Sequence, residues 1–191
     1  MRKIIFDIET QDAIGFDGKT EASMLDISVL SAYDSETNLY TSYLIEDLPK
    51  LWPALENADM LIGFNSDHFD IPLLNKYYPG DLTKIKSLDI LGEIKKTFGR
   101  RMKLDQIAEG TLGKGKAGHG LDAVFWWKKG EIEKIKLYCE DDVRITKEIY
   151  EYALANQKLL FKEGGKINEI KLDTSEWEKP NENKLTFTLP F

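Results

Sequence analysis

The segment KIIFDIET, residues 3–10, places two carboxylates in an apolar strand. Its isoleucines and phenylalanine predict a buried strand in the middle of a sheet. Side chains two residues apart in a strand point to the same face, so Asp7 and Glu9 project together. Buried carboxylates are costly unless they are paired, protonated or bound to metal. The segment therefore indicates a charged site at the end of a central strand, although a solvated strand end is an equally simple interpretation of D-x-E alone.

The residues that follow alternate between strand and helix patterns. Residues 25–33 and 39–44 flank the turn residues DSETN and indicate a hairpin. Residues 60–65 indicate a buried strand, and helices are expected at 48–58 and 69–79. The pattern predicts an α/β fold in which a mixed β-sheet, an antiparallel hairpin plus parallel strands, is flanked by α-helices.

The second half of the chain is predicted to be mainly helical. Residues 87–127 have helical spacing around a glycine-rich loop at 110–120, and a long helix is expected from about residue 131 to 161. Beyond the glycines at 164 and 165 the composition becomes polar. We therefore expect one domain over residues 1–163 and a C-terminal tail over 164–191 that docks as a strand or stays flexible.

The composition excludes several classes of protein. The single cysteine, Cys139, excludes an internal disulfide and a cysteine-based zinc site, and His68 and His119 lack zinc-ligand spacing. We find no apolar stretch long enough to span a membrane and no signal-peptide core, so we expect a cytoplasmic location. The net charge of -7 in 191 residues argues against a polyanionic partner unless the charge is unevenly distributed.

Two further segments supply carboxylates. Asp70 follows the strand at 60–65 and could simply cap a helix, but the carboxyl ends of parallel strands share one edge of a sheet, where it would face Asp7. In LYCEDDVRIT, residues 137–146, Tyr138 and Asp142 lie four residues apart and share one helical face. Hard cations prefer such oxygen ligands. The predicted ligands of Mg²⁺ or Mn²⁺ are Asp7, Glu9, Asp70 and Asp142.

Three motifs together resemble a known family. FDIET, NSDHFD and YCEDD match, in chain order, the motifs D-x-E, N-x-x-x-[FY]-D and Y-x-x-x-D of the DEDDy 3′→5′ exonucleases. That family belongs to the ribonuclease H-like superfamily and includes the proofreading domains of family-B DNA polymerases. The resemblance covers residue 3 to about residue 152.

The resemblance implies a role for each matching residue. Asp7 would bridge two metal ions, Glu9 and Asp142 would bind the ion that carries the attacking water, and Asp70 would hold the other ion. Tyr138 would orient that water. The implied activity is that of a stand-alone exonuclease that releases nucleoside 5′-monophosphates, with DNA as the expected substrate. Matching positions near the 3′-terminal nucleotide are Thr10, Asn65 and Phe69.

Several alternatives stay open at this point. A structure-selective endonuclease or a non-catalytic nucleic-acid-binding domain could use the same fold. Asn65 could merely satisfy backbone groups, and Phe69 could belong to the core. Residues 95–129 contain nine basic and three acidic residues with interspersed aromatics, which suits a surface that guides a single-stranded 3′ end or an ordinary solvated face.

One short match suggests a protein partner. QKLLF, residues 157–161, resembles the Q-x-x-L-F peptide with which bacterial replication proteins bind the sliding clamp. The matching residues are Gln157, Leu160 and Phe161. Their position at the end of the expected long helix favours a place in the core instead.

Overall fold

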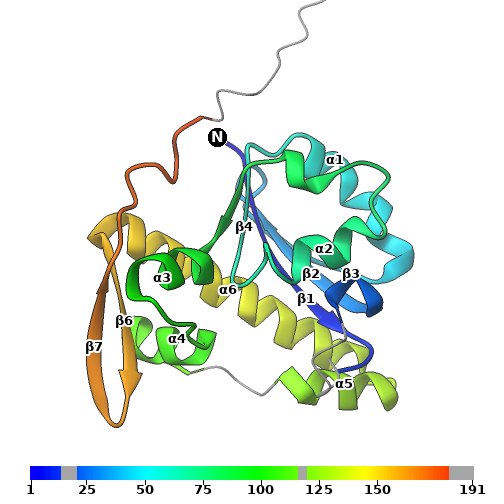
Figure 1. The fold of residues 1–191 in the computed structure, drawn as a ribbon. Coiled ribbons are helices and arrows are strands. Elements are labelled where there is room, and N and C mark those ends of the chain that lie inside the picture. Colours follow the sequence, from blue (N-terminus) through cyan, green and yellow to red (C-terminus); the bar gives the residue numbers. More distant parts are fainter. Residues whose placement is uncertain (14–20, 116–119, 181–191) are drawn as a thin grey trace, which may run out of the picture.

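The computed structural model describes residues 1–13, 21–115 and 120–180. Its main sheet has five strands in the order β3-β2-β1-β4-β5 (Figure 1). β2 is antiparallel to both of its neighbours, β1 and β3, whereas β4 and β5 continue the sheet parallel to β1. The prediction of a mixed sheet with a hairpin, parallel strands and flanking helices is therefore confirmed. The strands are β1 (Lys3–Thr10), β2 (Ile27–Asp34), β3 (Leu39–Tyr43), β4 (Met60–Gly63) and β5 (Ser87–Asp89).

Six α-helices occur in the described residues, together with short 3₁₀ helices at Ala22–Met24, Ile45–Lys50 and Leu82–Lys84. The longest is α6, whose 25 residues run across β1 and β2 (Figure 1). The helices are α1 (Trp52–Glu56), α2 (Asp70–Asn75), α3 (Ile90–Phe98), α4 (Leu104–Leu112), α5 (Gly120–Lys128) and α6 (Ile132–Asn156).

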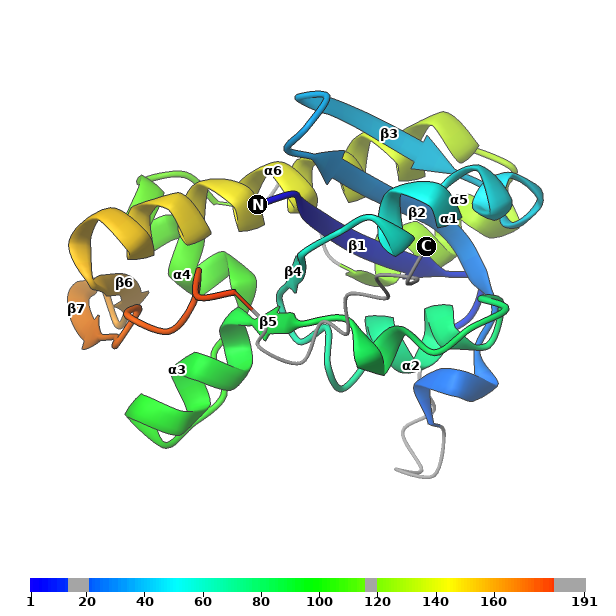
Figure 2. The ribbon, with the colours of Figure 1, turned by 90° about the horizontal axis from the view of Figure 1, so that it is seen from above.

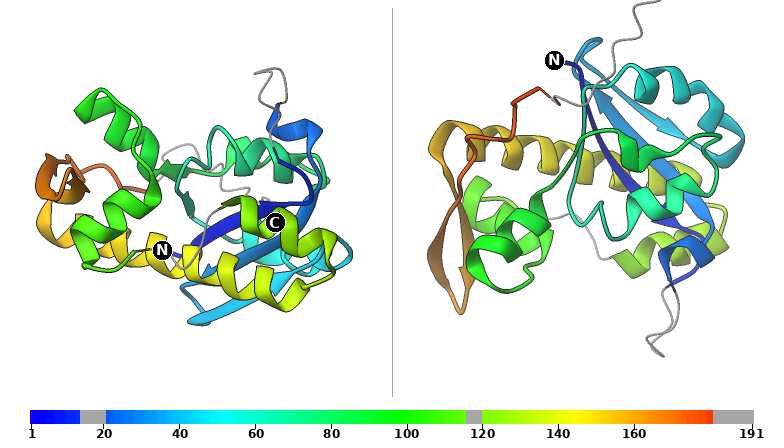
Figure 3. Two further views of the ribbon diagram at one scale, coloured as in Figure 1. Left: turned by 90° about the horizontal axis from the view of Figure 1, so that it is seen from below. Right: turned by 45° about the horizontal axis from the view of Figure 1, so that its top comes forward.

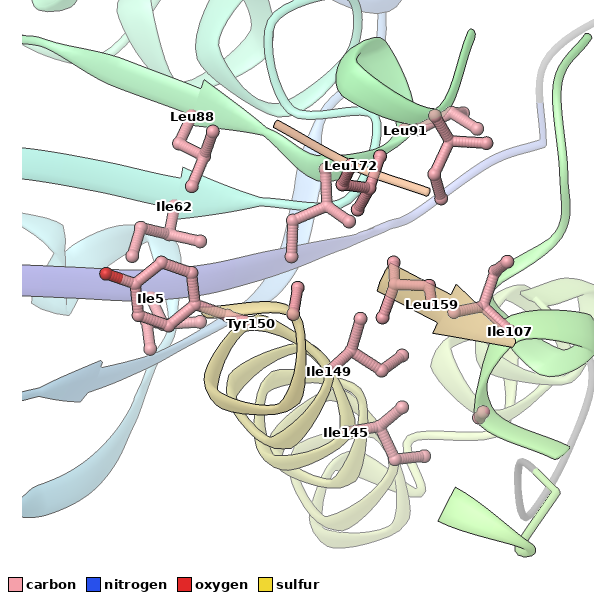
Figure 4. Packing of buried hydrophobic residues seen from close by; sticks show 14 of the residues in the cluster. Ile5, Ile62, Leu88, Leu91, Ile107, Ile145, Ile149, Tyr150, Leu159 and Leu172 are labelled. Atoms are coloured by element: carbon pink, nitrogen blue, oxygen red, sulfur yellow. The ribbon is translucent and has the colours of Figure 1, made fainter. Parts of the chain in front are cut away.

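The alternation of side chains along β1 divides the core into two layers. Ile4, Phe6 and Ile8 pack with residues of α1 and α2 on one face of the sheet. Ile5 points to the other face and packs in the cluster that contains Ile149 of α6 (Figure 4). Because Asp7 and Glu9 share the parity of Ile5, they point toward α6.

The end of the long helix differs from the sequence prediction. α6 ends at Asn156, because Gln157 has a φ of 54° and turns the chain out of the helix. The next residues form β6 (Lys158–Glu163), which pairs with β7 (Lys166–Lys171) in a separate antiparallel hairpin. The hairpin lies on the opposite side of the molecule from α1 and α2 (Figure 1, Figure 2 and Figure 3).

The segment after β7 packs against the domain. Leu172 and Trp177 are 5% and 3% exposed and belong to the same core cluster as Ile5. The Lys86 ammonium donates to the carbonyl oxygens of Glu176, Trp177 and Lys179. These contacts attach residues 172–179 to the edge of the main sheet. The division of the chain after residue 163 stays a prediction.

Candidate active site

Asp7 and Glu9 lie on the part of β1 that is no longer paired with β4. The parallel ladder between β1 and β4 pairs Lys3, Ile4 and Ile5 with β4 and goes no further. β2, in contrast, follows β1 over its remaining length. β1 therefore continues beyond β4 as it carries Asp7 and Glu9 toward its carboxyl end, the usual place for sites in such sheets.

The third carboxylate comes from α6. Carboxylate oxygens of Asp7, Glu9 and Asp142 all lie within 4.8 Å of one another. Glu9 is 9% and Asp142 is 2% exposed, whereas Asp141 faces outward and pairs with Arg144 at 3.7 Å. Two unit charges about 4 Å apart repel by roughly 4 kcal/mol at an effective dielectric of 20. We call these three residues the acidic cluster, and a divalent cation among them would offset this repulsion.

Asp70 lies beside the acidic cluster and outside its 4.8 Å limit. Phe69 occupies the N-cap of α2, and the Asp70 carboxylate reaches β1 instead, where Oδ1 accepts the Ile8 amide at 3.1 Å. Burial and the nearby negative charge of Asp7 raise the pKa of Asp70 well above its usual value. Asp70 is thus a fourth carboxylate adjacent to Asp7 that resists ionisation without a cation.

Tyr138 shares the inward face of α6 with Asp142. Its side chain is 4% exposed and packs edge-on against Trp126 with ring centroids 5.7 Å apart. Its other core neighbours include Val29 of β2 and Ile135. This packing fixes the ring one helical turn from Asp142.

The sequence analysis gave no role at the site to Cys139. Its Sγ donates to the Asp7 carbonyl oxygen at 3.2 Å and lies 3.6 Å from Asp7 Oδ2. Burial, followed by the charges of Asp7 and Glu9, raises the pKa of this thiol well above its usual value. Cys139 therefore stays a neutral thiol that helps to orient Asp7. Its position between the two motif residues Tyr138 and Asp142 was the available signal.

Asn65 occupies a special backbone position at the end of β4. Its φ of 75° is left-handed, which asparagine tolerates better than most residues. Its amide donates to Asp89 Oδ1 at 2.7 Å, and its side-chain Oδ1 accepts from Arg101. Burial is the main cause of the raised pKa of Asp89. The sequence analysis overlooked Asp89 and counted Arg101 only as part of a basic segment.

The other predicted substrate contacts have local partners. The Thr10 hydroxyl donates to the Asp12 carbonyl at 2.7 Å, and Thr10 is 8% exposed. Phe69 is partly buried against the core layer of α1 and α2. His119 and part of the loop at 113–120 lie outside the described residues. The described structure therefore groups the carboxylates of Asp7, Glu9 and Asp142, with Asp70 beside them and Tyr138 one helical turn from Asp142. The contacts of Thr10 and Phe69, in contrast, are local or belong to the core.

The basic segment is partly neutralised by neighbouring acids. Lys96 pairs with Glu93, and Lys128 lies 3.3 Å from Asp12. Arg100 pairs with Glu163 of β6 at 2.7 Å and lies over the rings of Phe98 and Phe161. The described residues of this segment therefore do not form a continuous basic surface. Each cation has to be considered with its own partner.

The QKLLF segment is part of the folded hairpin. Gln157 is the left-handed C-cap of α6, and the remaining residues lie on β6. Leu160 is half-buried and Phe161 is 3% exposed in the core. The Phe161 side chain is therefore inaccessible to a clamp in this fold.

Comparisons with known proteins agree with this architecture. Residues 4–154 match the RNase_H_2 family model of the RNase_H superfamily, and the chain belongs to that superfamily. Members of this superfamily are typically phosphodiester hydrolases. The carboxylate cluster is consistent with the divalent metal sites typical of these nucleases.

The family B DNA polymerase from the hyperthermophilic archaeon Pyrobaculum calidifontis has a similar fold, with a TM-score of 0.60 at 19% identity. The similarity covers 80% of this chain and 24% of the polymerase, so the chain spans about a quarter of that protein. No curated protein matches this sequence. In the described part of the chain, no helix combines the length and apolar character that crossing a membrane requires.

Proposed function

We propose that the protein is a metal-dependent 3′→5′ exonuclease that hydrolyses terminal phosphodiester bonds of single-stranded nucleic acid, with DNA as the first candidate. The observation that carries this proposal is the acidic cluster of Asp7, Glu9 and Asp142, with Asp70 beside it, on a ribonuclease H-like sheet. Four carboxylates from three separate segments suit hard divalent ions and few other ligands.

Mg²⁺ or Mn²⁺ fits this donor set, and we assign two ions to it. Asp7, Glu9 and Asp142 would hold one ion, and Asp7 and Asp70 would hold the other. Such ions lower the pKa of water and neutralise charge that develops on the transferred phosphate. Because burial raises the pKa of the Asp70 carboxyl, this group would ionise fully only when a cation is bound.

The remaining residues would position the substrate and the water. The Tyr138 hydroxyl, fixed by packing against Trp126, would orient the attacking water toward the terminal phosphate. Thr10, Asn65 and Phe69 would contact the 3′-terminal nucleotide, and the Thr10 hydroxyl also bonds locally to the Asp12 carbonyl. The product would be a nucleoside 5′-monophosphate.

The single cysteine is free and buried, which suits a reducing compartment, so a cytoplasmic location is part of the proposal. Clamp binding through Gln157, Leu160 and Phe161 is left out of it, because Phe161 would have to leave the core.

The decisive experiment is digestion of a 5′-labelled single-stranded oligonucleotide with Mg²⁺ or Mn²⁺. A ladder of shortened products supports the exonuclease, a single internal cut supports the endonuclease alternative, and retained binding without cleavage supports the non-catalytic alternative. Asp142→Asn should reduce the rate by about 10³-fold or more, as expected for loss of several kcal/mol of transition-state stabilisation. The matched control is Asp141→Asn, which alters a neighbouring carboxylate outside the acidic cluster and should leave the rate unchanged.

A further inference from the structure

Arg101 differs from the other cations of its segment in its partner. It is exposed in the connection between α3 and α4, and its guanidinium donates to the neutral amide oxygen of Asn65. The neighbouring Arg100 instead pairs with the carboxylate of Glu163. Among the described residues, no carboxylate lies within ion-pairing distance of Arg101. Its charge is therefore available to a ligand.

The Asn65 contact leaves most of the guanidinium free. Arginine has five N–H donors in a planar fork, and the Asn65 oxygen takes one nitrogen. The remaining donors match the oxygens of a phosphate group in geometry and charge. An amide partner therefore holds the side chain in place without neutralising it.

The position of Asn65 is itself fixed by the backbone. Its N–H donates to Asp89, which also accepts the amides of Leu91 and Gly92 at the start of α3. Its carbonyl accepts the amide of Phe69 at 3.0 Å. These bonds connect β4, α2 and α3 around one residue, so Arg101 is held by a rigid part of the fold.

The same turn links Arg101 to the candidate active site. Phe69, which bonds to Asn65, is followed by Asp70, and Asp70 accepts the amide of Ile8 between the two carboxylates of β1. Arg101 is therefore connected to the acidic cluster through Asn65 and the start of α2, although it is not one of the cluster residues. A cation at this position attracts a polyanion locally, whereas the net negative charge of the protein repels it.

We propose that Arg101 binds a backbone phosphate of the substrate strand other than the scissile one, with Asn65 as its positioning residue. This inference rests on the proposed function and deepens it. A contact remote from the reacting phosphate contributes equally to the ground state and the transition state. Its loss should therefore change KM and leave kcat in place.

The test compares Arg101→Ala with Arg100→Ala on a single-stranded oligonucleotide in Mg²⁺. Arg101→Ala should raise KM by about tenfold, change kcat less than about twofold, and lower the slope of log KM against log salt by about 0.7. Arg100→Ala should match the wild type in all three quantities. Arg101→Lys should recover part of the affinity, because lysine supplies the charge without the fork.

A substrate with one phosphate separates remote binding from chemistry. On the p-nitrophenyl ester of thymidine 5′-monophosphate, Arg101→Ala should equal the wild type. A large loss on this ester would overturn the assignment to a remote phosphate. An unchanged KM and salt slope on the oligonucleotide, with an active wild type, would overturn the inference and leave the proposed function intact.

Binding measurements keep the test valid if no cleavage is found. Fluorescence anisotropy with a labelled oligonucleotide in Ca²⁺ should give a Kd that is about tenfold weaker for Arg101→Ala than for Arg100→Ala. An inactive wild type that shows this difference would refute the exonuclease proposal alone. Equal Kd values for the two variants would refute the role of Arg101.

Discussion

The carboxylate of Asp70 accepts the backbone amide of Ile8 at 3.1 Å across 62 residues of sequence. This bond joins the first turn of α2 to the stretch of β1 that carries Asp7 and Glu9. It also keeps an almost fully buried carboxylate next to the charge of Asp7. The contact therefore organises the candidate site at a cost in folding stability.

Asp70→Asn should separate stability from activity. The Asn Oδ1 can still accept the Ile8 amide, while the charge that opposes folding is removed. Because the folded-state pKa of Asp70 is raised, its stabilising effect is present only below about pH 4, the unfolded pKa, and is lost as pH rises through the folded pKa. The variant should have a higher Tm than wild type at pH 7 in metal-free buffer, and the two should converge at acidic pH. Metal-dependent cleavage should fall by about 10³-fold.

The matched readout is thermal unfolding with and without Mn²⁺. Wild-type Tm should rise with added metal, since a ligand at 100 times its Kd stabilises by about 2.7 kcal/mol. Asp70→Asn should show a smaller rise. A variant that is less stable than wild type in metal-free buffer at pH 7 would contradict the argument from buried charge.

The ion pair of Arg2 and Asp34 predicts an acid-sensitive contribution to stability. Nη2 of Arg2 lies 2.6 Å from Asp34, and both side chains are less than one-fifth exposed. Burial raises the pKa of Asp34, but the hydrogen bonds from Arg2 and the Glu36 amide outweigh it and hold the pKa below its usual value. The contribution is present above about pH 4 and is lost as pH falls through the folded pKa.

Arg2→Ala should therefore lower the free energy of unfolding by about 1 kcal/mol near neutral pH. Urea denaturation at a series of pH values should show this difference unchanged from pH 8 to pH 5 (roughly) and shrinking below about pH 4. Lys50→Ala, which breaks an exposed pair with Asp47, should leave stability unchanged at every pH. A difference that grows on acidification would exclude the proposed cause.

The parts of the site that follow local periodicity could be predicted from the sequence. The period of two on β1 orients Asp7 and Glu9 together, and the helical period places Asp142 with Tyr138 on the inward face. The parallel sheet then brings the strand ends to one edge. These relations depend on spacing within single elements, and spacing is visible in a sequence.

The missed features depend on backbone turns and on contacts between distant segments. β5 has only three residues, too few for a recognisable alternation. Leu160 and Phe161 follow Ala153 by about two helical turns, a spacing that also suits a helix, and the left-handed Gln157 separates α6 from β6. The bond between Asn65 and Arg101 spans 36 residues and requires the left-handed φ of Asn65. Neither condition is a property of a local pattern.

Trp177→Ala tests whether the segment after β7 is part of the folding unit. The indole is 3% exposed, stacks on Tyr150 with centroids 6.0 Å apart, and donates to Glu93 at 3.3 Å. Its removal should cost about 3–5 kcal/mol in urea denaturation. Ile167→Ala on the exposed face of β7 should cost less than about 0.5 kcal/mol. Equal, small effects would support a separable tail after residue 163.

Two helical glycines should respond to alanine in opposite ways. A Cβ on Gly110 of α4 would lie 2.4 Å from the Phe161 Cα, so the α4 and β6 backbones would have to separate. A Cβ on Gly92 of α3 would meet Asp89 at an ordinary 3.5 Å. Alanine stabilises a helix by about 1 kcal/mol relative to glycine, whereas overpacking costs about 1–3 kcal/mol or more.

We therefore expect Gly110→Ala to lower the free energy of unfolding by about 2 kcal/mol and Gly92→Ala to raise it by up to about 1 kcal/mol, both measured in urea. Gly110→Ala should also move the hairpin away from α4. Because β6 carries Glu163, this movement should weaken its ion pair with Arg100. If Gly110→Ala were as stable as Gly92→Ala, close packing between α4 and β6 could not be what holds the hairpin on the domain.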